Sequence, residues 1–301
     1  MAPPPPMRLS GRVDPHLPAL GRRTLLALAG IGVVAACTRG ADTRTGGGGD
    51  DVTTVAYGDD PAQFFELTGP SAASKGVVVV IHGGFWQSQF DLSLGRPLAA
   101  SLAENGWTAV NLEYRSVGNG GGYPATFDDV AAGLDAIGDL DDVDTSTVIT
   151  LGHSAGGHLA VWAAGRDRLD TAAWNRPRVP VTAAVSQAGV LDLDLAIDEN
   201  LGGGAVQSLM GGEPDQPGLA EAYREADPIQ RVPLAVPVRC VHGDDDTTVP
   251  PNQSGSYVDA ATAAGGDATL TAVDGDHFTL IDPGSDAWAR TLQVLDALVA
   301  L

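Results

Sequence analysis

Ser154, His277 and the aspartates at positions 244–246 are the residues whose types and order could support nucleophilic catalysis. A serine hydroxyl is a weak nucleophile until a neighbouring base takes its proton, and a histidine base needs a third group that fixes its tautomer. In this chain the serine comes first, the aspartates follow and the histidine comes last. The residue types predict a serine nucleophile with a histidine base, and composition leaves open which aspartate would orient the histidine.

Gly152 and Gly156 flank Ser154 in the pentapeptide Gly-His-Ser-Ala-Gly, which fits the pattern G-x-S-x-G. On a strand-to-helix turn, this pattern holds a serine hydroxyl exposed at a sharp corner. In a chain with 39 glycines, the same five residues would also fit an ordinary glycine-rich turn. The flanking residues favour the catalytic interpretation, because the β-branched run at 148–151 predicts a strand and the residues after 154 predict a helix.

The candidate acid and base each follow a predicted strand. The apolar run 237–241 leads into residues 242–246, and the run 269–273 leads into residues 274–277. Open α/β sheets place their sites beyond the carboxyl ends of the strands, where these side chains would meet. Taken singly, an acidic triplet is also typical of a solvated turn and a histidine of a surface cap. Their occurrence together, in this order, favours a catalytic group.

The same chemistry needs N–H donors that stabilise the oxyanion of a tetrahedral intermediate. One candidate donor is the backbone N–H of Ala155, directly after the serine. The other would come from the loop after a predicted buried strand at 77–81, where the candidates are Gly83, Gly84 and Phe85. We expect Phe85 and Trp86 to form a wall of the substrate pocket.

Three further histidines lie close to these motifs. His153 occupies the variable position of the pentapeptide, and His158 follows the serine by four residues. We interpret both as packing residues, because a helix that leaves the turn carries His158 away from the serine hydroxyl. His82 precedes the candidate oxyanion loop, and we expect it to order that loop.

The elements that would position these residues alternate between strands and helices. Apolar runs predict strands at 77–81, 107–112, 148–151, 181–186, 237–241 and 269–273, and amphipathic spacing predicts helices at 91–105, 126–137, 254–264 and 286–301. A loosely alternating pattern at 52–69 predicts an opening antiparallel hairpin. The alternation predicts an α/β fold with a mostly parallel central sheet and helices on both faces. The irregular, glycine-containing stretch 192–225 is a candidate cap or lid.

Residues 1–36 resemble an export signal. Arg22 and Arg23 resemble the pair of a twin-arginine export signal. They lead into the apolar run 24–36, which is too short to span a bilayer as a helix. The run ends in Val-Ala-Ala before Cys37, which resembles a lipobox, where a cysteine receives lipid. We expect a signal peptide at 1–36, a flexible Gly-rich tether at 37–51 and one domain at 52–301. The alternatives for 24–36 are a single-pass anchor and a buried helix.

These features predict an exported protein, held on the outer face of the cell membrane through a lipid on Cys37 and touching the membrane in no other way. Cys240, the other of the two cysteines, would then have no disulfide partner. With 17 basic and 38 acidic residues, the chain is a poor candidate for binding nucleic acid. We see no metal-ligand spacing and no phosphate-binding loop, and therefore expect no metal and no cofactor. The oligomeric state is not indicated.

From about residue 52 onward, the chain resembles α/β-hydrolases of the esterase/lipase type. Within that fold it is similar to the kynurenine formamidase-like and feruloyl/acetyl-esterase-like branch. The resemblance is carried by His-Gly-Gly-Phe-Trp at 82–86, Glu-Tyr-Arg at 113–115, Gly152 to His158, Asp-Pro at 227–228, His-Gly-x-x-Asp-x-x-Val-Pro at 242–250, and Asp-His-Phe at 276–278. It implies the α/β-hydrolase fold and a triad of Ser154, Asp246 and His277.

Three functions remain in competition. The resemblance favours a serine hydrolase that cleaves an ester of a small or aryl carboxylic acid through an acyl-enzyme. An arylformamidase that hydrolyses N-formylkynurenine would use the same triad on a formamide. A catalytically silent surface binding module on a hydrolase scaffold is the third hypothesis, and an intact triad with an oxyanion loop argues against it. In the first two cases the partner is a small-molecule ester or formamide.

Overall fold

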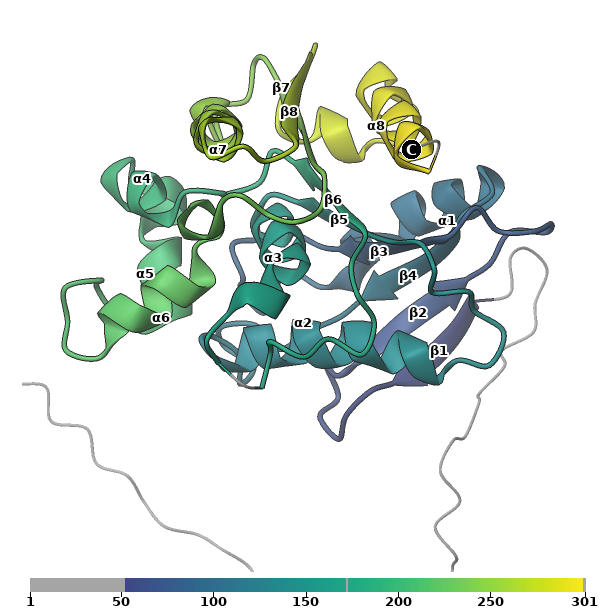
Figure 1. The fold of residues 1–301 in the computed structure, drawn as a ribbon, viewed down its shortest axis with the longest axis horizontal. Helices are drawn as coiled ribbons and strands as arrows, with labels where there is room; N and C mark the ends of the chain where they lie inside the picture. Colours follow the sequence, from purple (N-terminus) through teal and green to yellow (C-terminus); the bar gives the residue numbers. More distant parts are fainter. Residues whose placement is uncertain (1–51, 172, 300–301) are drawn as a thin grey trace, which may run out of the picture. The chain divides into compact units, whose positions relative to one another are not determined.

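An eight-stranded β-sheet runs through the part of the chain that the computed structural model describes, residues 52–171 and 173–299 (Figure 1). The strand order is β1-β2-β4-β3-β5-β6-β7-β8. The pairs β1–β2 and β2–β4 are antiparallel, and every later pair is parallel. The strands are β1 (Val52–Ala56), β2 (Phe64–Thr68), β3 (Val77–Ile81), β4 (Thr108–Leu112), β5 (Val148–His153), β6 (Ala183–Gln187), β7 (Val238–Gly243) and β8 (Ala268–Val273).

Strand β3 illustrates why the central strands are apolar without alternation. All five of its residues are buried, and they divide between two hydrophobic cores. Val77, Val79 and Ile81 belong to one core, whereas Val78 and Val80 belong to the other. Because both faces of this parallel strand are covered, every position is buried and apolar, and the run is continuously β-branched.

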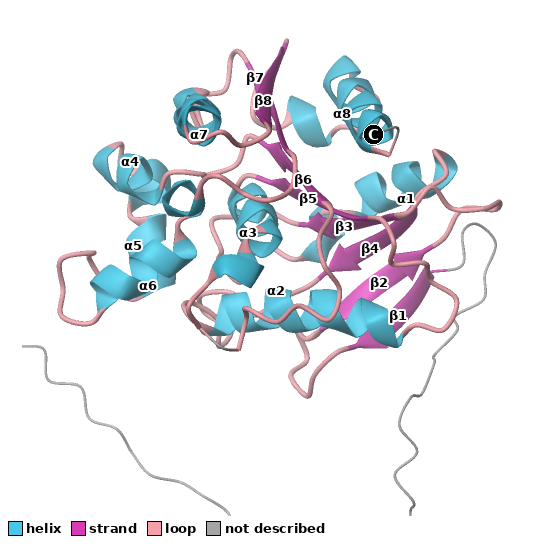
Figure 2. Ribbon diagram, viewed as in Figure 1, coloured by secondary structure: helices cyan, strands magenta, loops and turns pink. Residues whose placement is uncertain are grey.

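The two cores correspond to two layers of helices (Figure 2). Helices α1 (Arg96–Glu104) and α8 (Asp286–Leu298) pack on one face through Leu98, Leu102, Trp288 and Leu295. The opposite face is covered by α2 (Ala125–Ala136), α3 (Ala155–Ala164) and α7 (Asn252–Ala263). The predicted α/β fold with a mostly parallel sheet and an opening hairpin is therefore confirmed.

The expected irregular stretch at 192–225 is mostly helical, so that prediction was wrong in its secondary structure. It contains α4 (Leu193–Asp198), the 3-10 helix η4 (Leu201–Gly203), α5 (Ala205–Met210) and α6 (Leu219–Ala226). Glycines precede or follow these segments at positions 204, 211 and 218. Helices of six to eight residues have only about two turns, so their apolar residues show no clear helical spacing. The glycines of this stretch therefore suggested a loop. We call this segment, residues 192–226, the cap.

The cap is anchored to the body of the domain at the end of α6. The indole N–H of Trp162 donates to the carbonyl of Glu225 at 3.0 Å, and His158 Nε2–H donates to the carbonyl of Ala226 at 2.8 Å. The Glu225 carboxylate accepts from the hydroxyls of Tyr123 and Thr171. Because Trp162 and His158 both lie on α3, the helix that follows Ser154 also supports the cap.

The remaining short 3-10 helices lie in the connections: η1 (Leu92–Leu94), η2 (Ile137–Asp139), η3 (Arg166–Arg168), η5 (Pro228–Arg231) and η6 (Thr279–Ile281). The predicted closing helix extends only to Leu298 rather than to residue 301. The expected signal peptide, Cys37 and the tether lie outside the described residues. Within the described part of the chain, no helix combines the length and apolar character needed to span a membrane.

Candidate active site

Ser154 lies at the corner between β5 and α3 and has a backbone conformation that is rare for a residue with a side chain. Its φ is 56° and its ψ is −122°, and such outliers cluster at functional sites because the surrounding structure must hold them in place. The N–H of Ser154 donates to the carbonyl of Gln187 at the end of β6, at 2.9 Å. The neighbouring strand therefore fixes the turn.

The two glycines of the pentapeptide are required by close packing. A Cβ at Gly152 would lie 2.0 Å from the carbonyl oxygen of Gly156, and a Cβ at Gly156 would lie 2.0 Å from that of Ile81. The first turn of α3 is thus pressed against the strand before it and against β3. No side chain fits at either position without moving the backbone, so the helix can begin directly after Ser154 only if both residues are glycine.

Asp246 and His277 meet beyond the carboxyl ends of β7 and β8. His277 Nδ1–H donates to Asp246 Oδ2 at 2.6 Å, and both residues are buried. The other oxygen, Oδ1, accepts from the backbone N–H groups of Thr248 at 2.8 Å and Val249 at 2.9 Å. Asp244 and Asp245 are exposed, so the carboxylate that the structure joins to His277 is that of Asp246.

The environment of Asp246 keeps its carboxylate charged. Burial alone would raise its pKa, but interactions with His242, His277 and the N–H of Val249 outweigh burial and hold the pKa well below its usual range. An ionised carboxylate on Nδ1 directs the histidine proton to that nitrogen. Nε2 is then the ring nitrogen left to face a hydroxyl or a leaving group.

Ser154 and His277 line the same pocket, of about 510 Å³. His153 supports this arrangement from behind. Its ring centroid lies 4.4 Å from that of His277, and its Nε2–H donates to the His277 carbonyl at 2.9 Å. Burial lowers the pKa of His153 to about 3, so this ring is neutral at physiological pH. His153 and His158 both act as packing residues, as the sequence predicted.

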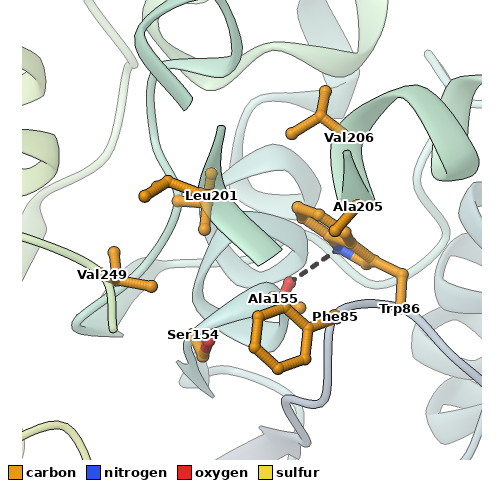
Figure 3. Close-up of a pocket in the computed structure, with 9 residues that line it drawn as sticks. Phe85, Trp86, Ser154, Ala155, Leu201, Ala205, Val206 and Val249 are labelled. Carbon is orange, nitrogen blue, oxygen red and sulfur yellow. Dashed lines mark hydrogen bonds between the residues drawn. The ribbon is translucent and has the colours of Figure 1, made fainter. Parts of the chain in front are cut away.

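The loop after β3 approaches the serine closely. A Cβ at Gly83 would lie 2.8 Å from the His153 carbonyl and 3.2 Å from the Ser154 Cβ, so only glycine allows this approach. Phe85 and Trp86 follow with positive φ values of 57° and 56°, conformations that are costly for bulky side chains. The indole N–H of Trp86 donates to the Ala155 carbonyl at 3.1 Å (Figure 3). This hydrogen bond ties the loop to the first turn of α3.

Ala155 is the first residue of α3. Main-chain N–H groups in the first turn of a helix have no carbonyl partner within that helix, so they are suited to bind an anion. The backbone N–H groups of Ala155 and of the loop at 83–85 are thus brought to the same corner as the Ser154 hydroxyl. This arrangement is suited to stabilising an oxyanion.

A buried polar network lies beneath this loop. His82 Nδ1–H donates to the Gly83 carbonyl at 2.8 Å, and Nε2 lies 3.1 Å from Glu113 Oε1. Glu113 also accepts from the backbone N–H groups of Leu92 at 2.7 Å and Tyr114 at 3.0 Å. His82 therefore orders the loop through both ring nitrogens, as the sequence predicted.

A second pocket meets the first at Ser154 and Phe85, which line both. It has a volume of about 270 Å³ and is lined by Trp86, Ala155, Val190, Leu201, Ala205, Val206 and Val249 (Figure 3). Three of these residues, Leu201, Ala205 and Val206, belong to the cap. The first pocket is lined instead by Gly83, Gly84, Phe90, Leu94, His153, Thr248, His277, Phe278 and Ile281.

Sequence reasoning named only Phe85 and Trp86 among these apolar lining residues. The aliphatic residues of the cap carry no chemical signature, and the glycine run at 202–204 indicated only that the segment was unusual. Phe90 and Leu94 lie far along the chain from His277 and Ile281, which line the same pocket. Only the folded chain brings these residues together.

A family model described as BD-FAE matches residues 67–260 of this chain. The chain belongs to the BD-FAE family. This is a family of α/β-hydrolase esterases, so the predicted resemblance to esterase-type α/β-hydrolases is confirmed.

Two curated relatives are esterases by name. Esterase LipC of Mycobacterium tuberculosis is 29% identical over 234 residues, which cover 69% of this chain and 54% of the relative. Isoprenylcysteine alpha-carbonyl methylesterase ICME of Arabidopsis thaliana is 27% identical over 247 residues, which cover 75% of this chain and 56% of the relative. The chain thus spans little more than half the length of either relative.

Solved structures share the fold at low sequence identity. Esterase B from Lactobacillus rhamnosis has a TM-score of 0.70 and 22% identity, with 83% of this chain and 86% of that chain covered. A truncated carbohydrate esterase from gut microbiota has a TM-score of 0.67 and 20% identity, with 87% and 99% covered. Together with family membership, these likenesses identify an esterase-type α/β-hydrolase.

Proposed function

We propose that the protein is a serine hydrolase that cleaves carboxylic esters through an acyl-enzyme. The observation that carries the proposal is the 2.6 Å hydrogen bond from His277 to Asp246, made by a histidine that lines the same pocket as Ser154. In this scheme Ser154 is the nucleophile, His277 the base and Asp246 the residue that orients His277. The esterase relatives support the reaction class.

The first half of the reaction forms the acyl-enzyme. Ser154 Oγ attacks the carbonyl carbon of the ester while His277 Nε2 takes the hydroxyl proton. The N–H of Ala155 and an N–H of the loop at 83–85 receive the oxyanion. When the tetrahedral intermediate collapses, the C–O bond to the alcohol breaks and His277 returns its proton to the leaving oxygen. In the second half, water repeats the attack on the acyl-enzyme and releases the acid.

The second pocket favours an ester over a formamide. A formyl group has only hydrogen beyond its carbonyl carbon, so it would leave the apolar space between Trp86 and Val206 unfilled. An acyl chain would fill that space and gain the free energy of apolar burial. We therefore rank an arylformamidase below an esterase.

Labelling with a fluorophosphonate probe tests whether Ser154 is the nucleophile. We expect the wild-type protein to be labelled and Ser154→Ala to be unlabelled, with Ser71→Ala as a matched control at an exposed serine. Circular dichroism would verify that each variant is folded. A folded wild-type protein that takes no label would instead support the silent binding module.

A substrate comparison separates the two enzymatic hypotheses. Hydrolysis of p-nitrophenyl acetate and butyrate would be measured beside hydrolysis of N-formylkynurenine, each as kcat/KM. We expect the esters to be preferred. A preference for N-formylkynurenine would replace the esterase proposal with the formamidase.

A further inference from the structure

The two pockets beside Ser154 differ in which catalytic group they contain. Only the pocket of about 510 Å³ is lined by His277, and only the pocket of about 270 Å³ is lined by Ala155. Phe85 and Ser154 line both and form the boundary between them. A substrate carbonyl bound at Ser154 therefore has one substituent on each side of this boundary.

Proton transfer determines which substituent lies on which side. His277 Nε2 must return its proton to the leaving oxygen, so the alcohol has to leave on the His277 side. The acyl chain then extends past Ala155 into the other pocket. We call the cavity with His277 the leaving-group pocket and the cavity with Ala155 the acyl pocket.

From this division we propose that the substrate is an ester of a short acyl chain with an apolar alcohol. The inference rests on the proposed function and names the substrate class of that same site. In this proposal the cap limits the length of the acyl chain, and the residues of the leaving-group pocket select the alcohol.

The acyl pocket is the smaller of the two, and most of its lining side chains are buried. Trp86, Val206 and Val249 are at most 2% exposed, and none of its lining side chains is charged. Its volume is about 270 Å³, against about 510 Å³ for the other pocket. Leu201 and Val206 of the cap stand over Ser154 as the far wall (Figure 3). A longer chain would have to displace them.

The leaving-group pocket is larger and apolar, and part of its lining is exposed. Phe278 is 63% exposed and Leu94 is 38% exposed, and both lie on its lining with Phe90 and Ile281. His277 and His153 line it too, but His277 is held by Asp246, and His153 Nε2–H donates to the His277 carbonyl. Besides Ser154 and these two histidines, Thr248 is the one lining residue with a polar side chain.

A sugar alcohol would bring several hydroxyls into this pocket, each needing a hydrogen-bond partner or water. The pocket offers an exposed aromatic ring and aliphatic walls instead. An apolar alcohol would cover these walls and gain the free energy of apolar burial. This is why we assign an aryl or alkyl alcohol rather than a carbohydrate.

Chain-length profiles test the acyl pocket. For wild-type protein we expect kcat/KM to be highest for p-nitrophenyl acetate or butyrate and at least about tenfold lower for the octanoate. Val206→Ala and Leu201→Ala are expected to raise the hexanoate-to-acetate ratio by about threefold to tenfold. The ratio is independent of how much enzyme is active, so partial misfolding does not alter it.

Val179→Ala is the matched control, because Val179 is buried in the same core but does not line the acyl pocket. It removes the same two methyl groups as Val206→Ala, and we expect it to leave the ratio unchanged. Equal profiles for the wild type, Val206→Ala and Leu201→Ala would overturn the assignment of the acyl pocket.

Two acetates with unactivated alcohols test the leaving-group pocket. We expect kcat/KM for 2-phenylethyl acetate to exceed that for a monoacetylated glucose by at least about tenfold, as measured by titration of the released acid. Phe278→Ala is expected to reduce this preference and to leave the hexanoate-to-acetate ratio in place. A preference for the sugar acetate would overturn the assignment.

Different results would contradict the proposed function and the proposed substrate class. A wild-type protein that takes no fluorophosphonate label and cleaves no ester would remove both. A protein that is labelled at Ser154 and hydrolyses esters, but whose ratios do not respond to these variants, would retain the proposed function and remove the substrate class alone.

Discussion

At the scale of single residues, Asp246 is the group on which the proposed chemistry depends most. One of its oxygens binds His277 and the other binds two backbone N–H groups, so the carboxylate is fixed in orientation as well as in charge. His242 lies 3.5 Å away, and its own ring is held by Ser254 and by the Val249 carbonyl. The loop after β7 thus fixes the position of the Asp246 carboxylate.

Replacing Asp246 with Asn tests this role. An amide in place of the carboxylate preserves most of the shape but no longer selects the tautomer in which His277 Nε2 accepts a proton. We expect kcat/KM for p-nitrophenyl acetate to fall by about 10⁴-fold with little change in the far-ultraviolet circular dichroism spectrum. Asp245→Asn is the matched control, since Asp245 is exposed. A loss of less than about tenfold in Asp246→Asn would contradict the proposed role.

Glu113 offers a second test at residue scale. Its carboxylate joins His82 to the N–H groups of Leu92 and Tyr114, and the side chains of Glu113 and His82 are buried. For Glu113→Gln we expect the protein to lose about 1–3 kcal/mol of unfolding free energy, because a neutral amide replaces a carboxylate that holds three buried polar groups. We also expect kcat to fall while KM changes little, because the loop at 83–85 positions an oxyanion donor. Urea unfolding measures the first effect and steady-state kinetics the second. An unchanged kcat would show that the hydrogen bonds of Glu113 do not position the loop at 83–85 for catalysis.

At the scale of elements, the site depends on how closely α3 approaches β3. The helix begins directly after Ser154, and Gly156 lies against the carbonyl of Ile81. The same helix carries His158 and Trp162, which hold the end of α6. One helix thereby connects the nucleophile, the sheet and the cap.

Gly156→Ala tests the tight contact. The added Cβ would lie 2.0 Å from the Ile81 carbonyl oxygen, so the helix or the strand must move. We expect a loss of about 1–3 kcal/mol of unfolding free energy. We also expect kcat/KM to fall in the fraction that remains folded, because Ser154 moves with the helix. Gly255→Ala is the control, since a Cβ there meets no heavy atom within 4 Å. Equal stability of both variants would show that the contact is not tight.

Asp227, directly after the cap, is expected to make the stability of the protein depend on pH. It follows α6 and accepts a hydrogen bond from the N–H of Leu193 at the start of α4. Burial, opposed by backbone hydrogen bonds and reinforced by the charges of Asp192 and Asp194, raises its pKa to about 7 from 3.8. Between these two values the folded state keeps a proton that the unfolded state has released. This group therefore makes the protein less stable as the pH rises through that window.

Asp227→Asn removes this titration. We expect the unfolding free energy of the wild-type protein, relative to the variant, to fall by on the order of 3 kcal/mol between pH 4.5 and 7.5. The buried rings of His153 and His158 titrate in the opposite sense, but they are present in both proteins and cancel in the difference. Urea unfolding at several pH values provides the measurement. A difference that does not vary with pH would mean that Asp227 has an ordinary pKa.

At the scale of the whole molecule, the prediction concerns the segment that precedes the described domain. Residues 1–51 lie outside the described structure, and the two named relatives are nearly twice the length that the chain matches. We propose that the protein is exported and held at the membrane surface through a lipid on Cys37. Residues 52–301 hold 11 basic and 34 acidic residues, and this net charge of −23 would keep the domain itself away from an anionic lipid surface.

Cys37→Ser tests the anchor. In a bacterial host that lipidates exported proteins, we expect the wild-type protein to enter the detergent phase of a Triton X-114 extraction and the variant to enter the aqueous phase. Intact mass measurement would detect the lipid directly. Cys240→Ser is the control, because Cys240 is buried in β7 and its burial raises the thiol pKa to about 12. Wild-type protein in the aqueous phase would contradict the anchor.

The sequence by itself determined those features that depend on neighbouring residues. The continuous β-branched run of β3 and the glycines around Ser154 are local patterns, and each has a local physical cause. A strand buried on both faces must be apolar throughout, and a helix that starts at a crowded corner must begin with small residues. The order of Ser154, the aspartates and His277 at strand ends followed from the same patterns.

Only the tertiary structure decided which distant residues share a cavity. Phe90 and Ile281 line one pocket, whereas Trp86 and Val206 line the other, and nothing in their types marks them as partners. Aliphatic side chains are interchangeable in a core, so their pattern predicts burial but not which neighbours they meet. The residues that would carry the chemistry were visible in the chain because they stand in specific local motifs and in a specific order. The shape that would select a substrate depends on packing between segments and exists only once the chain is folded.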